Sequence, residues 1–201
     1  MELTALGVNF VDGNAFGLDP LEDCEDEARA IAGVFGARAT LLVGPDATEA
    51  AAVEALQRSR RVHISTHGLH NVSAPSFQCI FFNPDAKDDG ILNAYELLRL
   101  DLRGLELVTF SACETALGRF DVSDNIRGIP AALLIAGVRT IVGTLWNVES
   151  NASRHFFTAF YRGLKENAST KKAFLEAQTS TRGAFPKYRD WGAFQLIGAW
   201  T

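Results

Sequence analysis

Extended and helical segments alternate along this chain, and the alternation constrains its fold more than any other feature. Apolar stretches rich in β-branched and aromatic residues are followed by segments with helical periodicity. Such alternation is typical of an α/β layered domain, in which helices cover a largely parallel sheet. The stretches that we expect to form strands are residues 3–10, 39–44, 60–66, 78–82, 105–111, 139–146 and 191–198.

Composition narrows the class of protein. The 201 residues are 47% hydrophobic and 21% charged, which predicts one globular domain over residues 1–201. The net charge of −5 comes without a basic stripe, so we expect no nucleic-acid partner. An apolar run of about 18 residues and a signal peptide are both missing, so no membrane association is expected. Three cysteines without framework spacing indicate a reducing, cytoplasmic setting.

The first helix is expected over residues 19–35. Asp19 is the predicted N-cap, Pro20 takes the first helical position, and Gly36 ends the helix. The acidic run from Glu22 to Glu27 then reads as a solvated face, favoured at a helix N-terminus.

A histidine and a cysteine each follow a predicted central strand. His67 ends "VHISTHG", and Cys113 follows "LELVTFSA". The carboxyl ends of parallel strands line the site crevice in open sheets, so both side chains are expected at one rim. A neutral imidazole there can accept the thiol proton and later protonate a leaving amine. The N–H groups of Gly68 and Cys113 are the predicted oxyanion hole.

At these residues the chain resembles CHAT-type peptidases, caspase-like domains that often accompany tetratricopeptide repeats. The matching segments are "VHISTHG", "DDGILNAYELLRLDLRGLELVTFSACETALG", "IPAALLIAGVRTIVGTLWNV" and "WGAFQLIG". The resemblance implies a caspase-like three-layer αβα sandwich with a mostly parallel sheet of about six strands. It places His67 and Cys113 on the catalytic dyad of a cysteine endopeptidase that needs no cofactor or metal.

The resemblance also implies partners and a setting. The substrate is expected to be a protein or peptide, and a sensor domain or subunit, built of tetratricopeptide repeats or otherwise, is expected to regulate cleavage. Related domains act as cytoplasmic effectors in bacterial signalling and antiphage defence. A catalytically silent or latent module that binds peptides without cutting them remains the alternative.

The predicted substrate pocket departs from the pattern of the wider caspase-like clan. Ser111 stands two residues before the cysteine, where caspases carry Gln and metacaspases carry Asp, and it is uncharged. Ser111 by itself therefore would not select an Arg or Lys side chain. Asp124 is a further pocket candidate, and Trp146, at a strand end, is either a wall of the substrate groove or a core aromatic residue.

Other chemistries fit less well. His63, His67 and His70 have a spacing that suits a zinc site on a helix, but four strand residues span about 13 Å, too far for one ion. Neither a phosphate-binding Gly-rich loop nor a Gly-x-Ser-x-Gly elbow occurs. Cys24 and Cys79 are interpreted as small buried hydrophobic residues.

Overall fold

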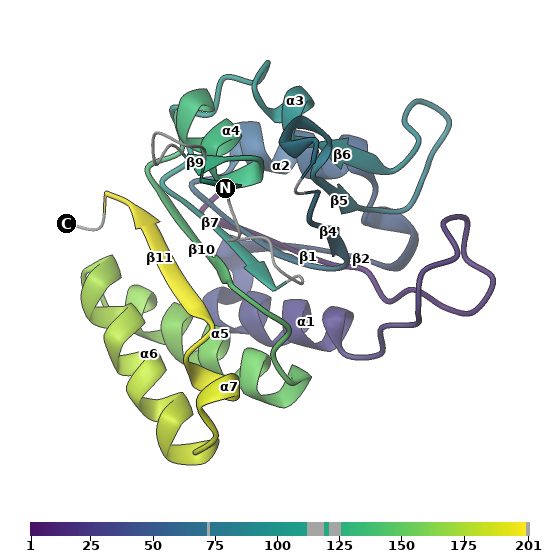
Figure 1. Ribbon diagram of the computed structural model, residues 1–201. Helices are drawn as coiled ribbons and strands as arrows, with labels where there is room; N and C mark the ends of the chain where they lie inside the picture. The colour runs from purple at the N-terminus through teal and green to yellow at the C-terminus, as the bar shows by residue number, and fades with distance from the viewer. Residues whose placement is uncertain (72, 112–118, 121–125, 200–201) are drawn as a thin grey trace.

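The computed structural model describes residues 1–71, 73–111, 119–120 and 126–199. Its main sheet has six strands in the order β11-β10-β7-β3-β1-β2 (Figure 1). Every neighbouring pair is parallel except β10 and β11, which are antiparallel. This confirms the predicted mostly parallel sheet. The strands are β1 (Leu3–Gly7), β2 (Ala39–Val43), β3 (Arg61–Ser65), β7 (Leu107–Ser111), β10 (Thr140–Thr144) and β11 (Phe194–Gly198).

Helices cover both faces of this sheet, which gives the expected three layers (Figure 1). One face carries α1 (Cys24–Phe35), α5 (Ser150–Lys165), α6 (Thr170–Ala184) and α7 (Tyr188–Trp191). The other carries α2 (Glu49–Arg58), α3 (Ala94–Leu97) and α4 (Ile129–Ala136), while 3-10 turns occupy Gly36–Arg38, Gly44–Asp46 and Pro75–Phe77. Among the described helices, none combines the length and the apolar character that crossing a membrane requires.

Alternate residues of each central strand enter two separate cores. On β3, Val62 and Ile64 pack into the core that contains Leu133 of α4. His63 points to the opposite side, where its ring meets Phe157 of α5 edge-on at 5.0 Å. Because side chains alternate along a strand, one short sequence supplies both cores.

Two smaller sheets stand apart from the main one. The first has the order β4-β5-β6 and is antiparallel, with strands β4 (Gly68–Leu69), β5 (Cys79–Phe81) and β6 (Ile91–Asn93). The second pairs β8 (Arg119–Phe120) with β9 (Ile126–Arg127). Within the expected stretch 78–82, Cys79–Phe81 form a strand, but in the smaller sheet. Asn93 caps α3 through a capping box with Glu96.

The predicted start of the first helix is wrong. The helix α1 begins at Cys24, and Asp23 rather than Asp19 is its N-cap residue, without a capping hydrogen bond from its side chain. Asn9, distant in sequence, supplies that bond, because its Oδ1 accepts from the Glu25 N–H at 3.0 Å and its Nδ2 donates to the Glu22 carbonyl at 2.8 Å. A tertiary partner therefore replaces the local cap that sequence rules favour.

Candidate active site

Strands β3 and β7 are neighbours in the sheet and end at the same edge. Their register pairs Ser65 with Ser111, and the N–H of Thr66 donates to the Ser111 carbonyl at 3.3 Å. His67 follows Ser65 by two residues, and Cys113 follows Ser111 by two. The strands β3 and β7 therefore end level with each other at one edge of the sheet. Cys113 itself lies outside the described residues, as does Asp124.

The His67 ring is held at this edge by the backbone of a preceding loop. Its Nε2 donates to the Asp19 carbonyl oxygen at 2.8 Å, and its ring lies 5.4 Å from that of Phe10. A carbonyl oxygen only accepts, so Nε2 carries the hydrogen and the Nδ1 of a neutral ring is left to accept a proton. Sequence reasoning missed this contact because it joins a main-chain atom to a residue 48 positions away.

Gly68 starts β4, and its N–H points away from the neighbouring strand. The Phe81 N–H donates to the His67 carbonyl at 3.0 Å, and Gly68 faces Ile80 in the register. Residue pairs of an antiparallel ladder alternate between hydrogen-bonded and non-hydrogen-bonded types. Since His67 and Phe81 form a hydrogen-bonded pair, Gly68 and Ile80 form the other type. The Gly68 N–H is thus directed outward from the β4 edge.

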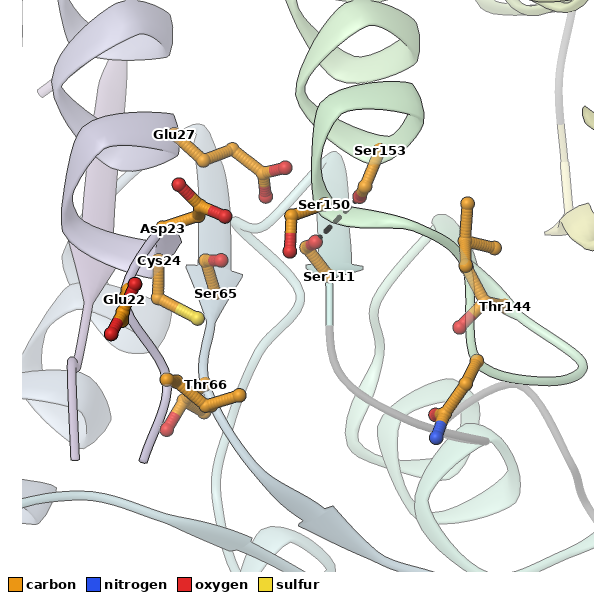
Figure 2. A pocket seen from close by; sticks show the side chains of 13 residues that line it. Glu22, Asp23, Cys24, Glu27, Ser65, Thr66, Ser111, Thr144, Ser150 and Ser153 are labelled. Carbon is orange, nitrogen blue, oxygen red and sulfur yellow. Dashed lines mark hydrogen bonds between the residues drawn. The ribbon is translucent and has the colours of Figure 1, made fainter. Parts of the chain in front are cut away.

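A cavity of about 230 Å³ opens beside this edge, between the first turns of α1 and α5 (Figure 2). The strands β3, β7 and β10 end at its floor, and Ser111 is one of its lining residues, hydrogen-bonded to Ser153 at 2.7 Å. Gly7 lets α1 start close to β1, because a Cβ there would lie 2.5 Å from the Cys24 carbonyl oxygen. The lining residues are Leu21, Glu22, Asp23, Cys24, Glu27, Ser65, Thr66, Ser111, Thr144, Asn147, Val148, Ser150 and Ser153.

Behind the cavity, a buried chain of hydrogen bonds holds Glu27. Its Oε1 lies 3.1 Å from Nε2 of His63, whose Nδ1 lies 2.7 Å from Oγ1 of Thr109. That hydroxyl in turn lies 2.7 Å from the hydroxyl of Tyr161, which donates to the Val62 carbonyl at 3.4 Å. Burial raises the pKa of the Tyr161 hydroxyl, so it stays protonated. Glu27 is only 3% exposed, so its assignment to a solvated helix face is wrong.

Comparison with known proteins places this chain in a family. The family model described as "CHAT domain" matches residues 7–199. The chain belongs to the CHAT domain family. It is 30% identical to Tetratricopeptide repeat protein 28 of Mus musculus and 27% identical to the Homo sapiens protein, in each case over 90% of this chain. The chain spans only 9% and 8% of those proteins, respectively.

Two solved structures share this fold. The Arg-specific cysteine proteinase gingipain R superimposes with a TM-score of 0.68 at 11% identity, covering 98% of this chain and 46% of that one. Separase from Saccharomyces cerevisiae, in its complex with securin, gives 0.61 at 14% identity, over 98% of this chain and 12% of that one. This CHAT domain thus has the caspase-like fold that the sequence predicted.

Trp146 lies beyond the cavity in this CHAT domain. Its Nε1 donates to the Arg189 carbonyl at 2.8 Å, and its ring contacts Tyr188 at 5.8 Å. It is not among the residues that line the described cavity. A role for Trp146 in the substrate groove stays a prediction.

The two described cysteines have different surroundings. Cys79 is 3% exposed, so it is the small buried residue that the sequence predicted, and burial, followed by the charge of Asp89, raises its pKa to about 11. Cys24 is half-buried and lines the cavity, so it is less enclosed than expected.

The three histidines weighed as zinc ligands do not share a site. His63 contacts Glu27 and Thr109, whereas His70 contacts Gln78 at 2.7 Å.

Proposed function

We propose that this CHAT domain is a cysteine endopeptidase in which Cys113 is the nucleophile and His67 the general base and acid. The register between β3 and β7 carries the proposal. Ser65 and Ser111 are paired at the ends of adjacent parallel strands, and each proposed catalytic residue follows two positions later. Ends of adjacent parallel strands are where α/β folds gather their reacting groups.

The described contacts suit the proposed steps. The Nδ1 of His67 takes the thiol proton, because Nε2 is engaged by the Asp19 carbonyl. The thiolate adds to the scissile carbonyl, and the Gly68 and Cys113 N–H groups stabilise the resulting oxyanion. The imidazolium then gives its proton to the leaving amine, and the C–N bond breaks. Water, deprotonated by the same ring, releases the acyl group and restores the thiol.

The relatives support a protein substrate and a regulatory partner. Gingipain R is described as Arg-specific, and separase was solved with securin, so neighbours of this fold act on or bind polypeptides. The curated relatives are tetratricopeptide repeat proteins, which supports control by such repeats. The bacterial effector role, the part in antiphage defence and the cytoplasmic location remain predictions from the family resemblance.

The decisive experiment labels the proposed nucleophile. An electrophilic peptide probe is incubated with the full chain and with Cys113→Ala, His67→Ala and Cys24→Ser, and adducts are located by peptide mass spectrometry. We expect one adduct at Cys113, lost in Cys113→Ala and slowed at least 100-fold in His67→Ala. The Cys24→Ser control keeps the adduct within a few fold.

Two results would count against the proposal. Labelling that disappears in Cys24→Ser would show that the wrong thiol was assigned. A folded protein whose Cys113 does not react, alone or with its repeat-containing partner, would favour the silent binding module instead.

A further inference from the structure

A separate groove of about 540 Å³ lies between α2 and the segment that runs from β6 past α3. These elements cover the face of the main sheet opposite α1 and α5 (Figure 1). The groove shares no lining residue with the cavity between α1 and α5. Its chemistry can therefore be considered apart from that of the candidate active site.

Alkyl groups form the walls of this groove. Ala50, Val53 and Gln57 of α2 line it, and their spacing of three and four residues places them on one face of the helix. Leu92 of β6 and Leu100, beyond α3, line it from the other segment. Val53 and Leu100 are half-buried against the core. The groove thus offers apolar contacts to an aliphatic chain.

Glu49, in the first turn of α2, lines the same groove with only 6% of its surface exposed. Its Oε2 accepts from the Gly90 N–H at 3.0 Å, whereas its Oε1 has no partner in any described residue. That oxygen is not sealed off, because Nε1 of Trp191 is the one fully enclosed side-chain atom without a partner in the described ranges. Buried polar groups normally have partners, so Oε1 indicates a place for a donor from another molecule.

The charges that act on Glu49 are negative. Burial, followed by the charges of Glu96, Asp88 and Asp89, raises the pKa of its carboxyl to about 7. The hydrogen bond from the Gly90 N–H opposes this shift. Glu49 forms no ion pair with a residue that the structure describes. A cationic ligand would supply the charge that this carboxylate lacks.

The cations nearby leave this position open. Arg58 lines the groove but is paired with Glu54 at 2.7 Å. Arg99 also lines it, with an exposed side chain that bonds to no described residue. Lys87 is exposed and lies outside the lining. The chain itself therefore does not neutralise Glu49 within the described ranges.

We propose that this groove binds a lysine side chain of a partner polypeptide, with the ammonium on Glu49 and the aliphatic stem against Val53 and Leu92. Long charged side chains bury their methylene groups along apolar surface while the charged end meets its partner. The inference does not depend on the peptidase function proposed above, since the groove contains neither proposed catalytic residue.

The chemistry favours lysine over arginine and over a metal ion. A lysine ammonium is a compact charge that suits the single open oxygen of Glu49, whereas a guanidinium carries five donors in a wide planar fork. Between alkyl walls, most of those five donors would lose water without gaining an acceptor. Within the described part of the chain, no three His, Cys, Asp or Glu side chains are placed to hold a metal ion.

The rim of the groove favours a polypeptide over a free amine. Gln57 and Arg99 are exposed there, and neither side chain makes a hydrogen bond to a described residue. A guanidinium donates and an amide both donates and accepts, so the two can bind the main-chain groups on either side of an inserted lysine. A free alkylamine has no such groups and would use Glu49 alone.

Peptide binding to the full chain tests the inference. Acetyl-Gly-Lys-Gly-amide, its arginine and norleucine equivalents and n-butylamine are titrated at pH 8 and followed by NMR at the backbone amides of Val53 and Gly90. We expect the lysine peptide to bind about tenfold more tightly than the norleucine peptide and n-butylamine, and about threefold more tightly than the arginine peptide. Glu49→Gln should remove its advantage over norleucine. Asp46→Asn is the matched control, because Asp46 is exposed just before α2 and outside the lining.

The pH dependence separates the buried carboxylate from its exposed neighbours. The pKa of Glu49 in the free groove is about 7, so lysine binding should be about tenfold weaker at pH 5.5 than at pH 8. The pH effect should disappear in Glu49→Gln, which keeps every other charged group that faces this position, namely those of Glu54, Arg58, Asp88, Asp89, Glu96 and Arg99.

Three results would overturn the inference. The first is equal affinity for the lysine and norleucine peptides. The second is lysine binding that neither Glu49→Gln nor pH 5.5 weakens, or that Asp46→Asn weakens as much as Glu49→Gln does. The third is n-butylamine binding as tightly as the lysine peptide, which would refute a polypeptide partner.

Discussion

Replacing Thr109 by Val tests the buried network that holds Glu27 at the cavity. Thr109 is fully buried on β7, and its hydroxyl lies 2.7 Å both from Nδ1 of His63 and from the hydroxyl of Tyr161. Valine has nearly the same shape, so little cavity is created. The change instead leaves two buried polar atoms without their partner, although Tyr161 keeps its longer contact with the Val62 carbonyl.

The expected loss of unfolding free energy follows from those two buried atoms. An unsatisfied buried donor or acceptor costs about 1 to 3 kcal/mol, so Thr109→Val should lower the free energy of unfolding by about 3 kcal/mol. Thr109→Ser keeps the hydroxyl and loses one methyl group, which costs about 1 kcal/mol. Urea unfolding at pH 7, followed by circular dichroism, measures both variants and the wild type.

A double-mutant cycle decides whether the network is the cause. Tyr161→Phe removes the second hydroxyl, so it should be less destabilising in the Thr109→Val background than in the wild type, with a coupling of about 1 kcal/mol. The reasoning is refuted if Thr109→Val is no more destabilising than Thr109→Ser, or if the two changes are additive.

Three further predictions concern titration, thiol reactivity and packing. Burial, followed by the charges of Glu96 and Asp88, raises the pKa of Glu49 from 4.5 to about 7. The folded state therefore holds a proton that the unfolded chain releases, and stability falls as pH rises through that window. Glu49→Gln should be more stable than the wild type by about 1 kcal/mol at pH 8, allowing for solvent screening, but not at pH 4.5. Urea unfolding checks this, with exposed Glu54→Gln as control, and a gain independent of pH would contradict it. Cys79, whose pKa is about 11, should resist iodoacetamide at pH 8 until urea unfolds the chain, as peptide mass spectrometry can verify, and modification of the folded protein would show the thiol to be accessible. Phe194→Ala removes a ring stacked on Phe156 and should lower the unfolding free energy by about 3 kcal/mol in urea titrations; a cost below 1 kcal/mol would mean that this edge strand contributes little.

Local patterns in the sequence were sufficient to predict the layered architecture. The alternation of Val62 and Ile64 with His63 on β3 assigns each side chain to one face, because the period of a strand is a local property. The capping box of Asn93 and Glu96 lies within a few residues, and it too was predictable. The position of His67 just beyond a strand, with Cys113 at the equivalent place after another, follows from the same patterns and the family resemblance.

Contacts between sequence-distant segments determined the features that local patterns did not predict. The sequence pattern assigned Asp19 to a helix cap, yet its carbonyl holds His67, and Asn9 completes the start of α1 instead. The same pattern placed Glu27 in water, whereas α1 packs against β3 and brings that carboxylate to His63. Such pairings depend on which surfaces meet when sequence-distant elements pack, and no short-range periodicity encodes them. The acidic lining of the cavity is therefore a property of the tertiary structure.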